Sequence, residues 1–256
     1  VEDLDPADVR ALVNDLMDKI ERDKDARKKR DEQYEEGIRR TGLGDDAPGG
    51  AQFTGANRVV HPLMTEACVD FAARAMKEIF PPNGPVRTKI VGKKDESEKI
   101  EKAERKATFM NWQLTEQMPE FRSDLEQLMT QLPLGGVQYL KLYFDHTLNR
   151  ITSEFVPVDD VYLPFAASNY YSAERKTHVQ YITKYEYEKR VSTGMYIEAD
   201  LTLVEDIDYS KATKANDKIE GREDNSYNED GLRTIFEVQT HADLEGDEFD
   251  PYIISI

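Results

Sequence analysis

Residues 134–167, LGGVQYLKLYFDHTLNRITSEFVPVDDVYLPFAA, carry the strongest structural pattern in this chain of 256 residues. Two runs within them, Val137–Phe144 and Arg150–Val156, are rich in the β-branched and aromatic residues that strands favour. Asp145–Asn149 lies between the runs and supplies turn-forming residues. We therefore predict a β-hairpin that ends at an acidic corner flanked by proline.

A helix is expected directly before this hairpin. Its apolar residues fall at helical spacing, and they are Phe121, Leu125, Leu128, Met129 and Leu132. Gly135 and Gly136 follow and suit a tight turn, because glycine adopts conformations that other residues avoid. The predicted order is a helix, a glycine turn and a hairpin.

The N-terminal segment predicts a helix whose character changes along its length. Asp5 followed by Pro6 is a favourable helix start, and one apolar face then extends as far as Ile20. Glu21–Arg40 has mixed charges and few large apolar residues. This composition is typical of an exposed helix, or of an arm that lies on a neighbouring molecule, rather than of a core element. We expect the first helix to project.

Residues 41–57 are rich in glycine and polar residues, as linkers are. We therefore predict a helical arm with its linker over 1–57 and an α+β domain over 58–256. The domain should begin with a helix near Pro62, followed by a short strand at Val86–Val91. A charged helix from about Glu96 to Gln117 should come next, with an inner face made of Ile100, Ala103, Ala107, Met110 and Leu114.

The last third of the chain adds strands. His178–Ile182 alternates as a strand does, and Thr183 can cap the helix that follows. Leu232–His241 and Tyr252–Ile256 form a predicted second hairpin, while 208–231 is polar enough to form a mobile excursion. The predicted fold class is α+β, with long N-terminal helices followed by a mixed or antiparallel β-rich domain.

The charge of the chain limits its partners. Its net charge is −17, and residues 201–256 contain 15 acidic against 5 basic residues. Such a chain gains no affinity for nucleic acid by broad counterion release, so a DNA partner would be passed rather than held.

The apolar window Val59–Phe80 contains six charged or titratable residues, which argues against a transmembrane helix and a membrane partner.

The single cysteine, Cys68, cannot form an intrachain disulfide, which favours assembly in a cytoplasm. Val1 is not an initiator methionine and no signal peptide follows it, so we expect an excerpt of a longer polypeptide.

The sequence offers little for catalysis. Asp159 and Asp160, with Glu154 nearby, are the residues that could hold magnesium, but a turn after Pro157 is the commoner reason for such a pair. The glycine-rich run Gly42–Ala47 follows a charged helix instead of a buried strand, so it is interpreted as a linker. The four histidines are dispersed. We predict no enzyme, no catalytic residue, no metal and no cofactor.

Aromatic residues suggest where the chain meets other molecules. The Asn169–Ser172 loop contains Tyr170 and Tyr171, and tyrosine is enriched at subunit contacts, although ordinary packing is the alternative. If the charged N-terminal segment lies on a neighbour, further interface candidates are Arg27, Arg30 and Tyr34. A salt-bridged helix surface is the alternative there. Trp112, on the charged helix, is expected in the core.

The order of long helix, Gly135-Gly136, strand Tyr139–Phe144 and corner Val156–Tyr162 resembles portal proteins of tailed bacteriophages, particularly of short-tailed phages. The resemblance extends more weakly from about Val59 to Tyr196. Portals often have a proline after the hairpin aspartate, where this chain has His146. The family offers no catalytic residue to transfer.

The resemblance implies a virion structural protein, assembled in the host cytoplasm as a homo-oligomeric, dodecameric ring at one capsid vertex. It also implies that 58–256 is the outward-facing, wing-like α+β domain of the portal. A terminase motor would drive double-stranded DNA through the ring at packaging, and DNA would leave through it at ejection. Tail adaptor and capsid proteins would be further partners. One alternative is another head-tail connector or adaptor; a more distant one is a metal-dependent nuclease using Glu154, Asp159 and Asp160.

Overall fold

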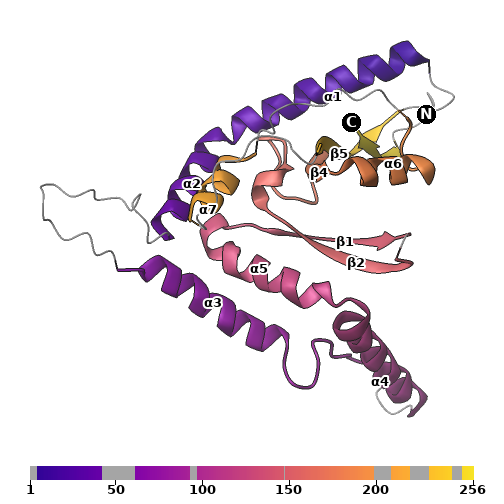
Figure 1. Cartoon of the computed structure of the whole chain (residues 1–256). Coiled ribbons are helices and arrows are strands. Elements are labelled where there is room, and N and C mark those ends of the chain that lie inside the picture. Colours follow the sequence, from indigo (N-terminus) through magenta and orange to yellow (C-terminus); the bar gives the residue numbers. More distant parts are fainter. Residues whose placement is uncertain are drawn as a thin grey trace, which may run out of the picture. The chain divides into compact units, whose positions relative to one another are not determined.

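The computed structural model describes residues 5–41, 61–92, 97–146, 148–198, 209–219, 231–243 and 250–256. Within these ranges the chain combines helices with two antiparallel sheets (Figure 1), which confirms the predicted α+β class with long N-terminal helices.

The chain divides into two compact units. The first, which we call the sheet unit, consists of Val1–Gly50 and Asp159–Ile256. The second, the hairpin unit, is Ala51–Val158 and is inserted between them, so the sequence-based boundary after residue 57 falls inside it.

The sheet unit contains four antiparallel strands in the order β3, β4, β5, β6. Their bounds are β3 Val161–Tyr162, β4 Arg175–Ile182, β5 Arg233–Ala242 and β6 Asp250–Ser255. The strand predicted at His178–Ile182 is confirmed, and so is the pairing of the last two strands, since β5 lies antiparallel to β6 with Val238 opposite Ile254.

Helix α6 (Lys184–Ser192) follows β4 directly. The predicted cap is confirmed, because the side chain of Thr183 accepts a hydrogen bond from the backbone N–H of Glu186. Tyr187 of this helix packs with Ile182 and Ile235 in a small cluster on the sheet.

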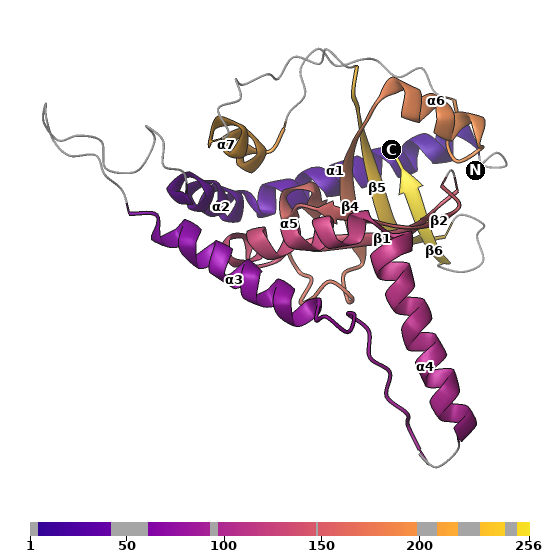
Figure 2. The same cartoon turned by 60° about the horizontal axis from the view of Figure 1, so that its bottom comes forward.

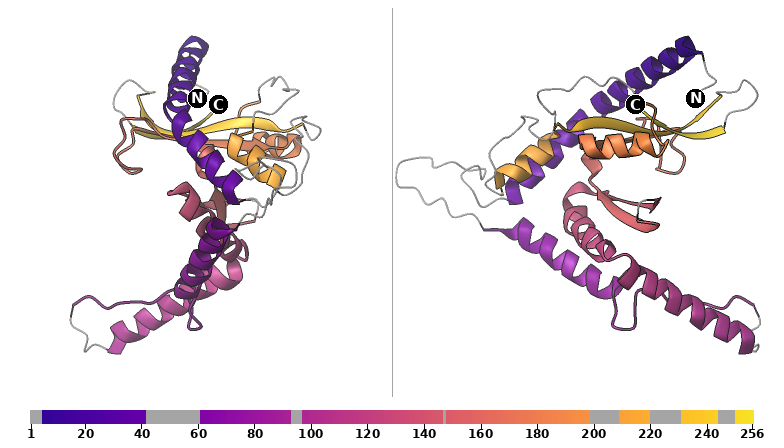
Figure 3. Two further views of the ribbon diagram at one scale, coloured as in Figure 1. Left: turned by 90° about the vertical axis from the view of Figure 1, so that its left-hand side faces the viewer. Right: turned by 45° about the vertical axis from the view of Figure 1, so that its right-hand side comes forward.

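Helix α1 (Pro6–Ala26) begins as predicted, with the Asp5 carboxylate accepting a hydrogen bond of 2.8 Å from the Ala7 N–H. It crosses one face of the sheet (Figure 3), and Leu16 and Ile20 pack against Val238 of β5, which is fully buried. This cluster forms a core of the sheet unit.

The sequence predicts Glu21–Arg40 as an exposed helix, or an arm on a neighbour, rather than a core element; the structure contradicts this for its buried residues. Helix α2 (Lys28–Thr41) buries Tyr34 and Ile38 and packs against helix α7 (Lys211–Ile219), which buries Ala212 and Ala215. A helix also replaces part of the mobile excursion predicted for 208–231.

The side of α1 that buries Leu16 and Ile20 continues past Ile20 with charged residues. Asp23 is 5% exposed, and Arg27, one turn further on, is half-buried. Charged side chains can occupy such positions only when partners neutralise them. Arg175 and Asp159, which lie far along the sequence, are these partners.

The hairpin unit begins with three α-helices. Its elements are α3 Leu63–Ile79, α4 Ser97–Trp112, a π-helical turn Gln113–Gln117, α5 Glu120–Gly135, β1 Tyr139–Asp145 and β2 Arg150–Val156. Helices α3 and α5 lie side by side (Figure 2), with Phe80 edge-on to Phe121 at their ends.

The predicted hairpin is confirmed, with Tyr139 opposite Val156 and Asp145 opposite Arg150. The turn before the hairpin contains Gly136, whose φ of +71° explains why glycine occupies this position. Helix α5 packs on β2, where the Ser153 hydroxyl donates a hydrogen bond to the Asp124 carboxylate.

Three expectations for this unit are wrong. Val86–Val91 forms no strand; instead the Asn111 side chain bonds both the N–H and the C=O of Val86 and holds the segment beside α4. The expected inner face of α4 is covered only in part, because Ile100 and Met110 are exposed while Ala103, Ala107 and Leu114 are half-buried. Trp112, expected in the core, is also exposed.

Candidate interaction surfaces

The loop between β3 and β4 presents aromatic side chains to solvent from a hydrogen-bonded framework. The Ala167 N–H donates to the C=O of Pro164 at 2.9 Å, and the Ser172 N–H donates to the Asn169 side chain at 2.8 Å. Tyr171 is 91% exposed and Phe165 is 87% exposed. Two large aromatic residues held out on an ordered loop form the kind of surface that binds another protein.

Tyr170 belongs to the same loop but packs against neighbouring side chains. Its ring lies 5.9 Å from that of Tyr171, edge-on, and 5.3 Å from the Lys176 ammonium. Burial raises the pKa of Tyr170, and the nearby charge of Glu237 adds to this effect. Of the two tyrosines predicted at a subunit contact, Tyr171 is therefore the freely accessible one, and Tyr170 supports it.

Arg27 lies at the centre of a polar junction inside the sheet unit. Its Nε is 3.0 Å from both carboxylate oxygens of Asp31, and its Nη2 donates to the backbone C=O of Asp159 at 3.0 Å. Its Nη1 donates to the C=O of Val161, and the guanidinium lies 4.8 Å from the centre of the Tyr162 ring. Arg27 thus ties the α1–α2 corner to the start of β3.

The Asp159 carboxylate joins this junction to α7. Its Oδ1 lies 3.6 Å from Nη2 of Arg27, and its Oδ2 accepts a hydrogen bond of 3.1 Å from Ser210. The Ser210 hydroxyl in turn accepts the N–H of Thr213 in the first turn of α7. Burial raises the pKa of Asp159, although the charge of Arg27 and the bond from Ser210 oppose the shift.

The remaining interface candidates lie on α2. The Arg30 guanidinium is 5.8 Å from the centre of the Tyr34 ring, and its Nη1 is 3.5 Å from Asp31. Tyr34 is only 5% exposed, so most of its surface is used within the chain. A subunit contact through Arg27, Arg30 and Tyr34 stays a prediction, and of the three Arg30 offers the most accessible side chain.

A buried ion pair that the sequence did not indicate fastens α1 to β4. Arg175 donates from Nε and Nη2 to the same oxygen of Asp23, at 3.0 and 2.7 Å, and both side chains are buried. Only the position of Asp23, three residues after the apolar Ile20, signals that it lies on the buried stripe.

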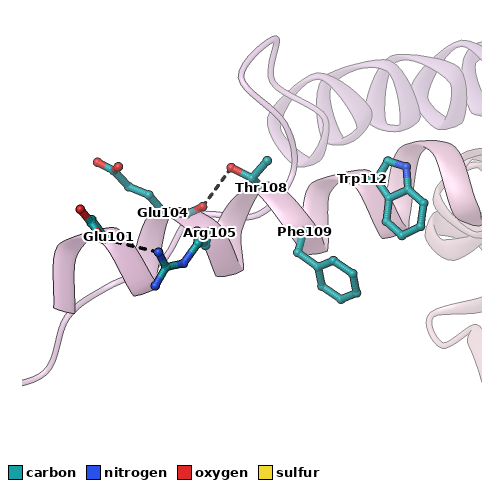
Figure 4. A pocket seen from close by; sticks show the side chains of 6 residues that line it. All are labelled: Glu101, Glu104, Arg105, Thr108, Phe109 and Trp112. Atoms are coloured by element: carbon teal, nitrogen blue, oxygen red, sulfur yellow. Dashed lines mark hydrogen bonds and ion pairs between the residues drawn. The ribbon is translucent and has the colours of Figure 1, made fainter. Parts of the chain in front are cut away.

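In the hairpin unit, α4 carries a second open surface that the sequence interpretation missed (Figure 4). A shallow depression of about 630 Å³ runs along one face of the helix, and its lining residues, among those that the structure describes, belong to α4. They are Glu101, Glu104, Arg105, Thr108, Phe109 and Trp112. The spacing of three and four that separates them is the one signal that could have identified this face.

The residues considered for metal chemistry do not converge in the structure. Arg27 occupies the neighbourhood of Asp159, and Glu154 lies opposite Lys141 in the hairpin. Among the described residues, no three His, Cys, Asp or Glu side chains gather as metal ligands. Cys68 is buried, and burial raises the pKa of its thiol. Gly42–Ala47 lies outside the described residues.

No protein-family model matches this chain, and no curated protein matches its sequence. In the part of the chain that the structure describes, every helix is too short or too polar to cross a membrane.

Proposed function

We propose that this chain is a subunit of a ring-shaped portal at one capsid vertex of a tailed bacteriophage. In the virion, the ring is the conduit through which double-stranded DNA is packaged and ejected. It is also the platform on which terminase, tail adaptors and capsid proteins dock.

The observation that carries this proposal is the order of elements over residues 120–162. Helix α5, the Gly136 turn, the β1–β2 hairpin, the 3-10 turn Val158–Asp160 and β3 follow one another in this order. This is the order on which the resemblance to portal proteins rests.

The distribution of charge also supports a conduit. The hairpin unit contains 14 basic and 14 acidic residues, and the sheet unit contains 20 basic and 37 acidic residues. The whole net charge of −17 therefore belongs to the sheet unit. Phosphate contacts are what hold a protein on DNA, so an acidic surface lets the duplex pass without being held.

Imaging of the purified full-length protein tests the proposal. Negative-stain electron microscopy should reveal closed rings with a central hole, since identical heterologous contacts close around an axis. Native mass spectrometry of the same sample gives the number of subunits, for which we expect twelve. Compact monomers under all assembly conditions would refute the proposal.

The β3–β4 loop gives this test a matched pair of variants. Tyr171→Ser should reduce the fraction of protein in rings if the loop lies at a subunit contact. Tyr185→Ser, at another exposed tyrosine of the sheet unit, serves as the control and should assemble normally. Equal assembly of both variants would remove the loop from the contact while leaving the ring itself in place.

A further inference from the structure

Helix α4 has an aromatic face that stays exposed among the described residues of its unit. The helix spans 16 residues and buries none of them. Phe109 is 55% exposed and Trp112 is 48% exposed, and their ring centres are 5.8 Å apart. Both side chains project from the same face (Figure 4), beyond the charged residues Glu101, Glu104 and Arg105. We call Phe109 and Trp112 the α4 aromatic pair.

This exposure has an energetic cost. Half-exposed phenylalanine and tryptophan side chains leave roughly 200 Å² of apolar surface in water. A helix of this length is also marginal in water by itself, because forming its first turn is unfavourable. In proteins, most helical stability comes from packing of an apolar face. On the opposite side, α4 is held by Asn111 and by the hydrogen bond from Thr88 to the C=O of Ala103. The aromatic pair therefore needs a partner of its own.

The hairpin offers an exposed apolar surface. Phe144 lies directly opposite Ile151, and Leu142 follows on the same face two residues away. All three are exposed. Ser153 shares this face and is covered through its bond to Asp124 of α5, so the covering ends where these three residues begin. We call Leu142, Phe144 and Ile151 the hairpin tip.

Charge favours a contact between hairpin units of two copies. The sheet unit of each copy carries −17, so sheet units repel one another, whereas the hairpin unit is neutral. Along α4, Lys102 and Arg105 are already paired with Glu98 and Glu101 on the same helix. A neighbour needs to supply only apolar surface.

We propose that the hairpin tip of a second copy of this chain packs on the α4 aromatic pair. The two patches differ, so the contact is heterologous, and repetition of such a contact closes a ring. This inference rests on the proposed function, which supplies copies of the chain as the neighbours. The roughly 800 Å² that each partner buries in a standard interface leaves room for a polar rim around this apolar centre.

Trp112 is the only tryptophan, so its fluorescence reports on this contact directly. We expect its emission to move to shorter wavelength, and its quenching by acrylamide to fall, as full-length protein is concentrated from monomer to assembly. Leu142→Ser/Phe144→Ser should abolish this change and weaken assembly by about 30-fold, as loss of a central aromatic anchor does. Phe71→Ser, at an exposed phenylalanine of α3, is the matched control and should behave as the wild type.

Mixing two variants tests the heterologous arrangement. Phe109→Ser retains the hairpin tip, and the hairpin-tip variant retains the aromatic pair, so the mixture should form dimers that neither protein forms alone. Circular dichroism should confirm that both variants remain folded. Absence of mixed dimers would overturn the inference, and so would protection of Trp112 already in the dilute monomer. If wild-type rings form while Trp112 stays exposed, this contact is refuted and the ring proposal stands; if the wild type never assembles, the proposed function fails.

Discussion

The two units of this molecule differ in charge and in where their exposed apolar residues lie. The sheet unit builds a core between α1 and the sheet around the fully buried Val238, and it carries the entire net negative charge. The hairpin unit is neutral, and it leaves Phe109, Trp112 and Phe144 exposed. The acidic unit therefore combines a core with a loop on which Tyr171 is 91% exposed, whereas the neutral unit exposes apolar residues on a helix and on a hairpin.

The largest effect should come from breaking the buried ion pair of the sheet unit. Asp23→Ala leaves the Arg175 guanidinium buried without its partner, which should cost about 3–5 kcal/mol of unfolding free energy. Hydrogen exchange should speed up in β4 and β5 and stay unchanged in α5. Asp25→Ala, at an exposed position of the same helix, is the control. Loss of protection in both units would show that they do not behave independently.

A core truncation in the hairpin unit provides the reciprocal case. Leu125 is buried in α5, and Leu125→Ala should cost about 2–4 kcal/mol through lost burial and the cavity left behind. Faster exchange should be confined to α3, α5 and the hairpin. Leu148→Ala, at an exposed leucine of the hairpin turn, should change little. A greater loss in β5 than in α5 would contradict the division into units.

The attachment of α4 can be tested at a glycine. Gly84 has a φ of +92°, and a Cβ there would lie 2.7 Å from the Asn111 side chain. Because Asn111 is fixed by its bonds to Val86, Gly84→Ala should cost about 2 kcal/mol from backbone strain and crowding. Gly92→Ala meets no atom within 4 Å and tests strain alone at a φ of +98°. Thermal unfolding of both variants gives the difference; equal losses would exclude the crowding by Asn111.

The smallest effect is a dependence on pH in the sheet unit. Burial raises the pKa of Asp159, so the folded state binds this proton more tightly than the unfolded state does. Stability from this group should therefore rise as the pH falls through the raised pKa, and level off near the ordinary value of about 4. In urea titrations across this range, Asp159→Asn should remove that rise, and Asp25→Asn should keep it. A wild-type profile in Asp159→Asn would rule out Asp159 as the source.

Local sequence patterns sufficed wherever neighbours along the chain determine structure. The β-branched and aromatic runs Val137–Phe144 and Arg150–Val156, the glycine turn and the Thr183 cap could all be predicted, and the structure has each of them. The end of the buried stripe of α1 could not be predicted, because Asp23 and Arg27 are charged. Their burial depends on the partners Arg175 and Asp159, which lie far along the sequence.

The candidate surfaces also differ in whether the sequence alone could predict them. Tyr171 could be identified from its loop, since turn-forming residues place it at the surface. Trp112 could not, because an apolar residue on an amphipathic helix predicts burial within the chain, and a face left for a second molecule has the same pattern.

The insertion of the hairpin unit has a consequence for how the protein is made. Leu16 and Val238 meet in one core although more than 200 residues separate them. At about 5–20 residues per second, the ribosome needs roughly ten seconds or more to deliver the second of them. Helix α1 therefore emerges long before its sheet, while the hairpin unit, whose contacts all lie within one continuous segment, can fold first. A chaperone that shields the nascent N-terminal helix during this interval would raise the yield of native protein.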